Sequence, residues 1–339
     1  MYQRPNAYEM RLQGLFNGIT ETEAHAIFNE LALEAFVHQF EHNPVYKSWC
    51  ELRGAHPSNV NTIEAIPFLP ISIFKTKPVA CFNVQNQLYF LSSQSSGEQA
   101  SKHYIHEMAF YYRHLKRCFE YALGAVKSYN IIGLLPHYLE RPHSSLIAMC
   151  RELMIQSGQQ GNDFFINPDA NFIKRLHQLQ ANGKPCIIFG VRFAFIEWAQ
   201  HIDFGSNAIL IETGGMKNRA PEMSREAFNV FALKHYKPAA LYSEYGMTEL
   251  FSQCYAQHKQ HFICPPSLKI FARSAAHPEE RFSANQSGPL DIIDLANIDT
   301  CCFIATEDVG TLYTPKHFEV LGRSDHSGNR GCHALWTQA

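Results

Sequence analysis

The sequence has no long hydrophobic run, no strong net charge and no cysteine framework, and each absence excludes a class of protein. A transmembrane helix needs about 18 consecutive apolar residues, and the chain has no such stretch, so we expect no membrane span. The 29 Lys and Arg nearly balance the 31 Asp and Glu, which gives a formal net charge of −2 with His neutral. This balance argues against nucleic acid or an anionic membrane as the main partner.

The N-terminus and the cysteines point to the same compartment. The first six residues lack the apolar core of a signal peptide, and ten Cys are spread without the spacing of a disulfide scaffold. We therefore expect a cytoplasmic protein. The chain has 339 residues, 46% hydrophobic and 18% charged, which is a globular composition at a length greater than one core usually supports. We expect two or more packed lobes.

Hydrophobic periodicity predicts an α/β fold. The apolar stripe in residues 21–40 predicts a helix, and the prolines in residues 66–75 indicate an extended segment. Strands and helices then alternate, which favours mostly parallel sheets covered on both faces. The expected strands are 88–91, 129–135, 164–166, 186–191, 208–211 and 239–242, and the expected helices are 144–156, 193–199 and 223–235. Beyond about residue 250, turn residues punctuate short strands, which predicts a small β-rich subdomain over about 251–321.

A loop of small residues follows the strand at 88–91. Ser95, Ser96 and Gly97 offer hydroxyl and backbone N–H donors between this strand and a long helix, and Lys102 adds a positive charge. Such a turn at a helix N-terminus can bind a phosphate. The segment lacks the glycine patterns of Walker and dinucleotide-binding loops, and an ordinary surface loop fits it equally well.

Two further segments carry polar groups at expected strand ends. Tyr245, Gly246, Thr248 and Glu249 follow the strand at 239–242, where α/β folds bind ligands, and they can stack on a base, bond a phosphate and hold Mg²⁺. A polar strand exit with Tyr in the core is the alternative. Asp308 is placed to accept hydrogen bonds from a ribose, and Gly322-Arg323 can form a hinge. Two ordinary turns would explain that pair of segments as well.

Several His, Cys and aromatic residues need separate weighing. Four side chains within eleven residues could bind zinc: Cys254, His258, His261 and Cys264. The alternative is a hairpin with both Cys packed inward. His103, His106 and His114 are most simply explained as a solvated helix face. The aromatic segment 189–195 suits the lining of a fatty or aryl acid pocket and equally a plain core.

In this order, the three loop segments resemble the adenylate-forming (acyl/aryl-CoA ligase) superfamily. Residues 95–102 resemble its phosphate loop, Tyr-Gly-Met-Thr-Glu at 245–249 its most specific motif, and Thr306-Glu307-Asp308 its ribose-binding motif. Within it the chain is most similar to the acyl-protein synthetase (LuxE) family, through the segments 66–70, 135–141, 322–323 and 330–332. Gly214 and Gly215 stand where the superfamily has its adenine-side glycines.

The resemblance implies a fold, a reaction and roles for these residues. It implies a large adenylation domain with mixed sheets sandwiching helices over residues 1–321, with α/β subdomains to about 250 and a hinge and short tail at 322–339. It implies activation of a fatty or aryl acid with ATP and Mg²⁺, with Glu249 at the metal and Asp308 at the ribose. The activated acyl group passes to a thiol, and Cys332 is the resident candidate, since neighbouring cations favour its thiolate.

Two departures from the superfamily keep alternatives open. Glu98 stands close to where the triphosphate would lie, and only 16 residues follow Arg323, so we expect the further C-terminal domain with its catalytic Lys to be largely missing. An acyltransferase that uses a ready-made thioester is one alternative. A non-catalytic adenylate-binding subunit of a reductase-type complex is another. A carrier protein, CoA, a reductase or a thioesterase are the partners that these readings imply.

Overall fold

The computed structural model describes residues 2–92, 99–135, 143–181, 183–199, 202, 204–214 and 223–323. The α-helices are α1 (Tyr8–Gly14), α2 (Glu21–His42), α3 (Pro44–Leu52), α4 (Ile73–Thr76), α5 (Met108–Leu123), α6 (Ser145–Ser157), α7 (Ala170–Gln180), α8 (Arg192–Trp198) and α9 (Arg225–Tyr236). Short 3₁₀ turns are η1 (Ile63–Ala65), η2 (Val126–Ser128) and η3 (Leu295–Asn297). None of the helices in these ranges combines the length and apolar character needed to cross a membrane.

The strands form one large mixed sheet and one separate hairpin. They are β1 (Leu69–Pro70), β2 (Leu88–Leu91), β3 (Lys102–Ile105), β4 (Asn130–Leu134), β5 (Asp163–Phe165), β6 (Cys186–Val191), β7 (Ala208–Thr213), β8 (Ala240–Tyr245), β9 (Cys254–Gln257), β10 (Phe262–Ile263), β11 (Leu268–Ala272), β12 (Ser287–Asp294), β13 (Phe303–Thr314) and β14 (His317–Arg323). Over the described residues the large sheet has twelve strands in the order β11-β12-β13-β14-β10-β9-β8-β7-β6-β4-β5, with β1 beside β13. Strands β2 and β3 pair with each other.

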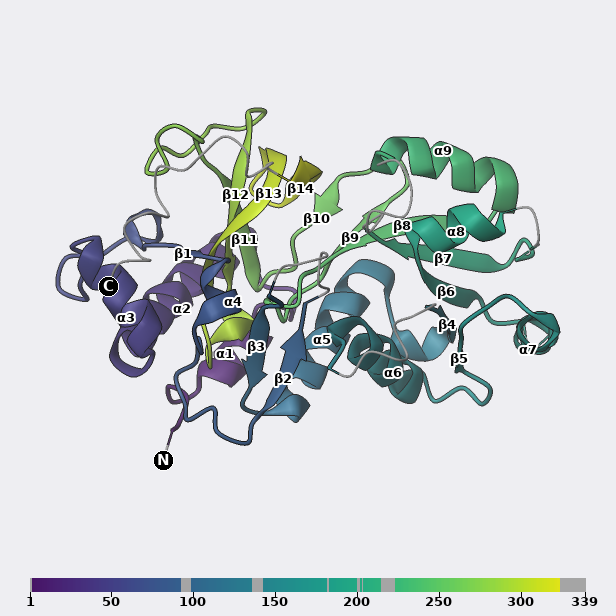
Figure 1. Cartoon of the computed structure of the whole chain (residues 1–339), viewed down its shortest axis with the longest axis horizontal. Helices are drawn as coiled ribbons and strands as arrows, with labels where there is room; N and C mark the ends of the chain where they lie inside the picture. Colours follow the sequence, from purple (N-terminus) through teal and green to yellow (C-terminus); the bar gives the residue numbers. More distant parts are fainter. Residues whose placement is uncertain are drawn as a thin grey trace.

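The sheet changes character at β8. Strands β4 to β8 run parallel, whereas β9 is antiparallel to β8, and antiparallel pairing continues through β10–β14, β14–β13, β13–β12 and β12–β11. Figure 1 shows α8 and α9 on one side of the parallel strands and α5 and α6 on the other. Helices α1 to α3 lie at the opposite end of the molecule, near β11 to β13 (Figure 1). The buried parallel strands are continuous apolar runs, as strands covered on both faces must be.

Local sequence explains where the main helices begin. Thr20 caps α2 by accepting a hydrogen bond from the Glu23 N–H, and the Glu23 carboxylate accepts from the Thr20 N–H, which is a complete capping box. Ser144 caps α6, and Asp169 caps α7, through hydrogen bonds to backbone N–H groups of the first turn. These short-range signals are readable in sequence, and the predicted helices over residues 21–40, 144–156, 193–199 and 223–235 are confirmed.

The α/β class and the mixed sheet are confirmed, and each of the six predicted strands is present with small shifts of its ends. The large sheet is continuous through both halves of the chain, and the division at about residue 250 stays a prediction. The extended segment after residue 66 forms β1, but the helical turn α4 follows it directly.

The phosphate-loop segment is placed differently from the prediction. Residues 102–105 form β3 and not the start of a helix, because they pair with β2 from Leu88↔Ile105 to Leu91↔Lys102. Helix α5 begins only at Met108, so the segment leads into β3 and does not run directly into a helix.

The histidine and aromatic predictions also need correction. His103 belongs to β3 and is fully buried, and His114 on α5 is 3% exposed. His106 is exposed, but it lies on the bend between β3 and α5, so the predicted solvated helix face is wrong for all three residues. Phe189, Val191 and Phe195 are fully buried in the core. Gly190 packs so tightly on Phe195 that an added Cβ would lie 2.4 Å from its ring, so this segment is core and not an open acid pocket.

Candidate active site

The candidate site is built on the loop that leaves β8, where the parallel and antiparallel parts of the sheet meet. Tyr245 is the last residue of β8, and its ring packs against those of Phe262 and Phe318, with centroids 5.9 and 5.4 Å away. The Tyr245 hydroxyl donates a hydrogen bond of 2.8 Å to Asp308 Oδ2. Burial, and then the negative charge of Asp308, hold the pKa of Tyr245 well above its ordinary value, so the phenol stays protonated.

The sequence suggested that Asp308 lies at a strand end or in a turn, but the structure places it within β13. It is 6% exposed and stands opposite Arg323, the last described residue of β14. Arg323 Nε donates to Asp308 Oδ1 over 3.2 Å. Each carboxylate oxygen has two acceptor positions, so Asp308 can hold Tyr245 and Arg323 and still accept hydrogen bonds from a ligand hydroxyl.

Glu249 is bound by the hairpin that carries the phosphate-loop segment. Its side chain is buried, and Ser101 Oγ donates a hydrogen bond to Glu249 Oε1. Burial raises the pKa of Glu249 above its ordinary value, while the hydrogen bond from Ser101 acts in the opposite direction. The charges of Arg323 and Asp308 also act on Glu249, which places all three groups in one neighbourhood.

The two ends of the phosphate-loop segment are tied together beside Glu249. The Ser92 N–H donates to the Ser101 carbonyl over 3.1 Å, and the Ser101 N–H donates to Ser92 Oγ over 2.9 Å. Ser95, Ser96 and Gly97 lie outside the described residues. Ser92 and Ser101, which flank the segment, are therefore held together, and Ser101 is the one that binds Glu249.

His103, two residues further along the hairpin, holds the backbone of the same loop. Its Nδ1 lies 2.9 Å from the Thr248 carbonyl, and its Nε2 lies 2.9 Å from Thr300 Oγ1. A carbonyl can only accept, so Nδ1 carries the proton and Nε2 accepts from the Thr300 hydroxyl. Burial lowers the pKa of His103 to about 4, which keeps the ring neutral and this arrangement intact at neutral pH.

Asn297 completes the anchoring of the loop. Its Nδ2 donates to the Glu249 carbonyl over 2.7 Å, next to the carbonyl that His103 holds. Sequence reasoning missed Ser101, His103 and Asn297, which are far from the loop in sequence, and no local pattern singles them out. The only available signal was the alternation of residues 102–105, which is typical of a strand.

Gly246 has a specific steric role in the loop. A Cβ at this position would lie 2.5 Å from Glu244 Oε1, so the neighbouring carboxyl group occupies the space that a side chain would need. Burial, together with the nearby charge of Glu212, raises the pKa of Glu244 to about 8. Glu212 itself forms a two-pronged ion pair with Arg192, at 2.9 and 3.2 Å. This group of three ionisable side chains, Arg192, Glu212 and Glu244, was also missed from the sequence.

One further predicted site residue, Lys102, is not brought to this cluster. Among the described residues, Lys102 is exposed on the opposite face of β3 from His103, and its ammonium lies 5.2 Å from the centre of the Tyr89 ring. Gly214 directly follows β7, and Gly215 lies outside the described ranges, as does Cys332.

The four side chains of the zinc alternative do not form a ligand set. In the described part of the chain no group of three or more His, Cys, Asp or Glu side chains is placed to hold a metal ion. Cys254 and Cys264 are buried, 1% and 3% exposed, whereas the exposed His261 stacks on Tyr313 with ring centroids 3.9 Å apart. His258 is on the turn after β9 and its N–H bonds to the Leu241 carbonyl. The zinc alternative is therefore wrong, and the hairpin with inward-facing cysteines is observed.

Comparison with known proteins identifies the family. A family model described as "Acyl-protein synthetase, LuxE" matches residues 17–339. The chain belongs to the LuxE family of acyl-protein synthetases. As a LuxE protein it is an enzyme of the ligase type. Two curated relatives are long-chain-fatty-acid–luciferin-component ligases. That of Vibrio harveyi is 22% identical over 94% of this chain and 89% of its own length, and that of Aliivibrio fischeri is 21% identical over 91% and 88%.

Solved structures place this LuxE protein in a wider fold group. A 2-hydroxyisobutyryl-CoA ligase in complex with 2-HIB-AMP and CoA has a TM-score of 0.67 at 13% identity, covering 96% of this chain and 73% of that one. ATP-bound MatB from Rhodopseudomonas palustris has a TM-score of 0.51 at 10% identity, covering 71% and 49%. The LuxE chain thus shares the fold of adenylate-forming ligases.

Proposed function

We propose that this LuxE protein activates a long-chain fatty acid with ATP as an acyl-adenylate and then transfers the acyl group to a thiol. The observation that carries the proposal is the meeting of Tyr245, Asp308 and Arg323 beside the Ser101–Glu249 pair. These groups come from segments distant in the chain, and they match the residues that the family resemblance assigns to the nucleotide. The names of the two curated relatives support a long-chain fatty acid as the substrate.

In the first step a carboxylate oxygen of the fatty acid attacks the α-phosphorus of ATP. The bond from that phosphorus to the bridging oxygen breaks, and pyrophosphate leaves. Both reactants are anions, so the protein must position them and offset their charge. In our proposal Asp308 accepts hydrogen bonds from the ribose hydroxyls, Tyr245 lies along the adenine side, and the predicted phosphate-loop residues Ser95, Ser96 and Gly97 supply donors for the phosphates.

Glu249 fits a Mg²⁺ ion that accompanies ATP. Its carboxylate is a hard oxygen ligand, and its bonded partner is the neutral hydroxyl of Ser101. Mg²⁺ in nucleotide sites is usually held by one or two carboxylates together with phosphate oxygens. Burial penalises the charged form of Glu249, and a bound cation would offset that penalty. When bound, the ion would neutralise charge on the phosphates, and Glu249 would hold it.

In the second step a thiolate attacks the carbonyl carbon of the adenylate. The bond from that carbon to the phosphate oxygen breaks, AMP leaves, and a thioester forms, while the thiol proton has gone to solvent. Cys332 is our candidate for this thiol, because Arg330 and His333 in the same segment favour its ionised form. A carrier-protein thiol and CoA are the competing acceptors.

The test combines pyrophosphate exchange with intact-mass measurement. We expect exchange of labelled pyrophosphate into ATP that depends on added fatty acid, and a mass increase equal to one acyl group that hydroxylamine removes. Cys332→Ala should keep the exchange and lose the adduct, whereas the control Cys50→Ala should keep both. Absence of exchange across a panel of saturated fatty acids and aryl acids would refute the activation step. An adduct that persists in Cys332→Ala would refute the assignment of the thiol.

A further inference from the structure

The segment Tyr2–Pro5 makes several polar contacts with the turn at Asp299, which is far away in the sequence. Arg4 bonds both oxygens of Asp299, with Nε 2.7 Å from Oδ1 and Nη2 2.6 Å from Oδ2, and the Tyr2 hydroxyl donates to Oδ1 over 2.8 Å. The Asp299 side chain is 3% exposed, so these contacts are made away from water. The Arg4 guanidinium also lies 4.0 Å from the centre of the Phe110 ring. We call residues 2–5 the N-terminal strap.

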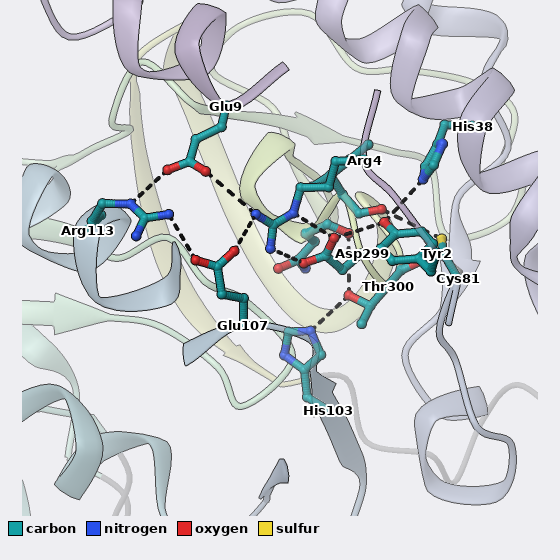
Figure 2. A network of polar contacts seen from close by, with 12 residues as sticks. Tyr2, Arg4, Glu9, His38, Cys81, His103, Glu107, Arg113, Asp299 and Thr300 are labelled. Atoms are coloured by element: carbon teal, nitrogen blue, oxygen red, sulfur yellow. Dashed lines mark hydrogen bonds and ion pairs between the residues drawn. The ribbon is translucent and has the colours of Figure 1, made fainter. Parts of the chain in front are cut away.

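The turn that receives the strap also holds the candidate active-site loop, and Figure 2 shows the first part of this link, from Arg4 through Asp299 and Thr300 to His103. Asp299 is followed by Thr300, whose hydroxyl is 2.9 Å from His103, and His103 holds the Thr248 carbonyl. Asn297, at the start of the same turn, holds the Glu249 carbonyl. The Thr300 N–H in turn bonds to the Asn297 carbonyl over 2.9 Å, so the turn is one closed unit. A displacement of the turn would therefore move the backbone of Thr248 and Glu249 together.

We propose that Arg4 is a positioning residue, and that the N-terminal strap sets the position of Thr248 and Glu249 through Asp299, Thr300 and His103. The functional part of this inference rests on the proposed adenylation, whereas the structural coupling does not depend on it. In the described part of the chain, the polar contacts of the strap involve none of the residues assigned to the nucleotide, so we expect its effect to pass through the turn. Misplacement of reacting groups by about 1 Å can cost about 100-fold in rate, so a small shift of this turn is enough to matter.

The same network provides a matched control. Arg113 bonds Glu9 over 2.8 Å and Glu107 over 3.1 Å, and Arg4 bonds Glu107 as well, over 3.0 Å. Arg113 thus shares acidic partners with Arg4 and lies on the outer side of the network, while Asp299 is bonded by Arg4 (Figure 2). Arg4→Lys keeps a positive charge but loses the planar fork that bonds both oxygens of Asp299. Arg113→Lys makes the same chemical change without touching the turn.

The first readout is hydrogen exchange of the backbone amides, followed by mass spectrometry on the full chain without substrates. We expect Arg4→Lys to raise the exchange rate of the peptide covering residues 245–252 at least about fivefold, as local opening of that loop becomes easier. Arg113→Lys should leave that peptide within about twofold of wild type. Exchange rates in the N-terminal helices α1 and α2 serve as the internal reference, because they report any general loss of stability. Faster exchange in α1 and α2 with unchanged exchange at 245–252 would overturn the proposal.

A double variant tests whether the effect passes through His103. His103→Asn keeps a donor for the Thr248 carbonyl but breaks the link to Thr300. If Arg4 acts along the proposed route, adding Arg4→Lys to His103→Asn raises exchange at 245–252 by a smaller factor than adding it to wild type, because only the Asn297 contact then joins the turn to the loop. Multiplicative effects of the two changes would overturn the route. If Arg4→Lys does not fold, Tyr2→Phe removes a single donor from Asp299 and is expected to shift exchange in the same direction by a smaller factor.

Activity provides the second readout. In pyrophosphate exchange, we expect Arg4→Lys to lower kcat about 10-fold with KM for the fatty acid changed less than twofold, and Arg113→Lys to lower neither. A wild-type enzyme without exchange activity would count against the proposed function, and the amide-exchange comparison would still decide the structural coupling. Normal kcat in a folded Arg4→Lys variant with faster exchange at 245–252 would show that the strap does not govern catalysis, and would overturn the positioning role.

Discussion

The burial of neutral His103 makes a quantitative prediction about acid stability. The ring is fully buried, and its pKa is about 4 in the folded chain, against an ordinary value of 6.5. Between these two values the unfolded chain binds a proton that the folded chain excludes, so stability must fall as the pH falls. Integrated over that window the loss is about 3 kcal/mol, and about 2.5 kcal/mol of it is reached by pH 4.5. Protonation would also place a donor on Nε2, which now accepts from Thr300.

The assay is urea unfolding at a series of pH values from 7.5 to 4.5. His103→Asn keeps a hydrogen-bond donor near the Thr248 carbonyl and removes the titrating group. We expect it to be less stable than wild type at pH 7.5, with the difference shrinking by about 2.5 kcal/mol towards pH 4.5. His277, whose side chain is 70% exposed, gives the control variant His277→Asn. A difference between wild type and His103→Asn that stays constant across this range would refute the reasoning.

Three further predictions follow from the site. Asp308→Asn should raise KM for ATP about 10-fold with a smaller change in kcat, measured by pyrophosphate exchange, since a charged hydrogen-bond acceptor is lost; an unchanged KM would remove Asp308 from the ribose site. Ser101→Ala removes the hydrogen bond that lowers the pKa of Glu249, so the acidic limb of the pH–rate profile should move to higher pH; an unmoved limb contradicts this role. The pKa of Glu244 is raised to about 8, so wild type should lose stability relative to Glu244→Gln as the pH rises from 4.5 to 8, in urea unfolding; the opposite slope contradicts the protonated state.

Hydrophobic periodicity predicted most of the helices and strands, and the order of the sequence motifs predicted part of the candidate site. The strand at Cys186–Val191 is a continuous buried apolar run, which a sequence displays directly. The order of the motifs placed Tyr245 and Asp308 at a shared site, and their hydroxyl–carboxylate bond is consistent with that expectation.

What the sequence did not reveal are contacts between residues far apart in the chain. Arg4 and Asp299 are separated by 295 positions, and Ser101 and Glu249 by 148. No periodicity or spacing rule links such pairs, because their proximity is a product of the strand order. The phosphate-loop hairpin was misread for a related reason. The four residues of β3 run directly into the pattern of α5, and only their pairing with β2 separates the two elements.

The curvature of the large sheet brings two distant strands of the candidate site together. Tyr245 on β8 and Asp308 on β13 are separated in the sheet by β9, β10 and β14, a distance of about 19 Å if these strands lay flat at the usual spacing. Their 2.8 Å bond therefore requires the sheet to curl over on itself. Strand β13 changes register between Val309 and Gly310, and a Cβ on Gly310 would lie 2.3 Å from the Glu319 carbonyl oxygen. A side chain at Gly310 would force β14 away from β13, so this glycine, which makes no part of the Tyr245–Asp308 bond, helps to set the curvature that brings the two residues together.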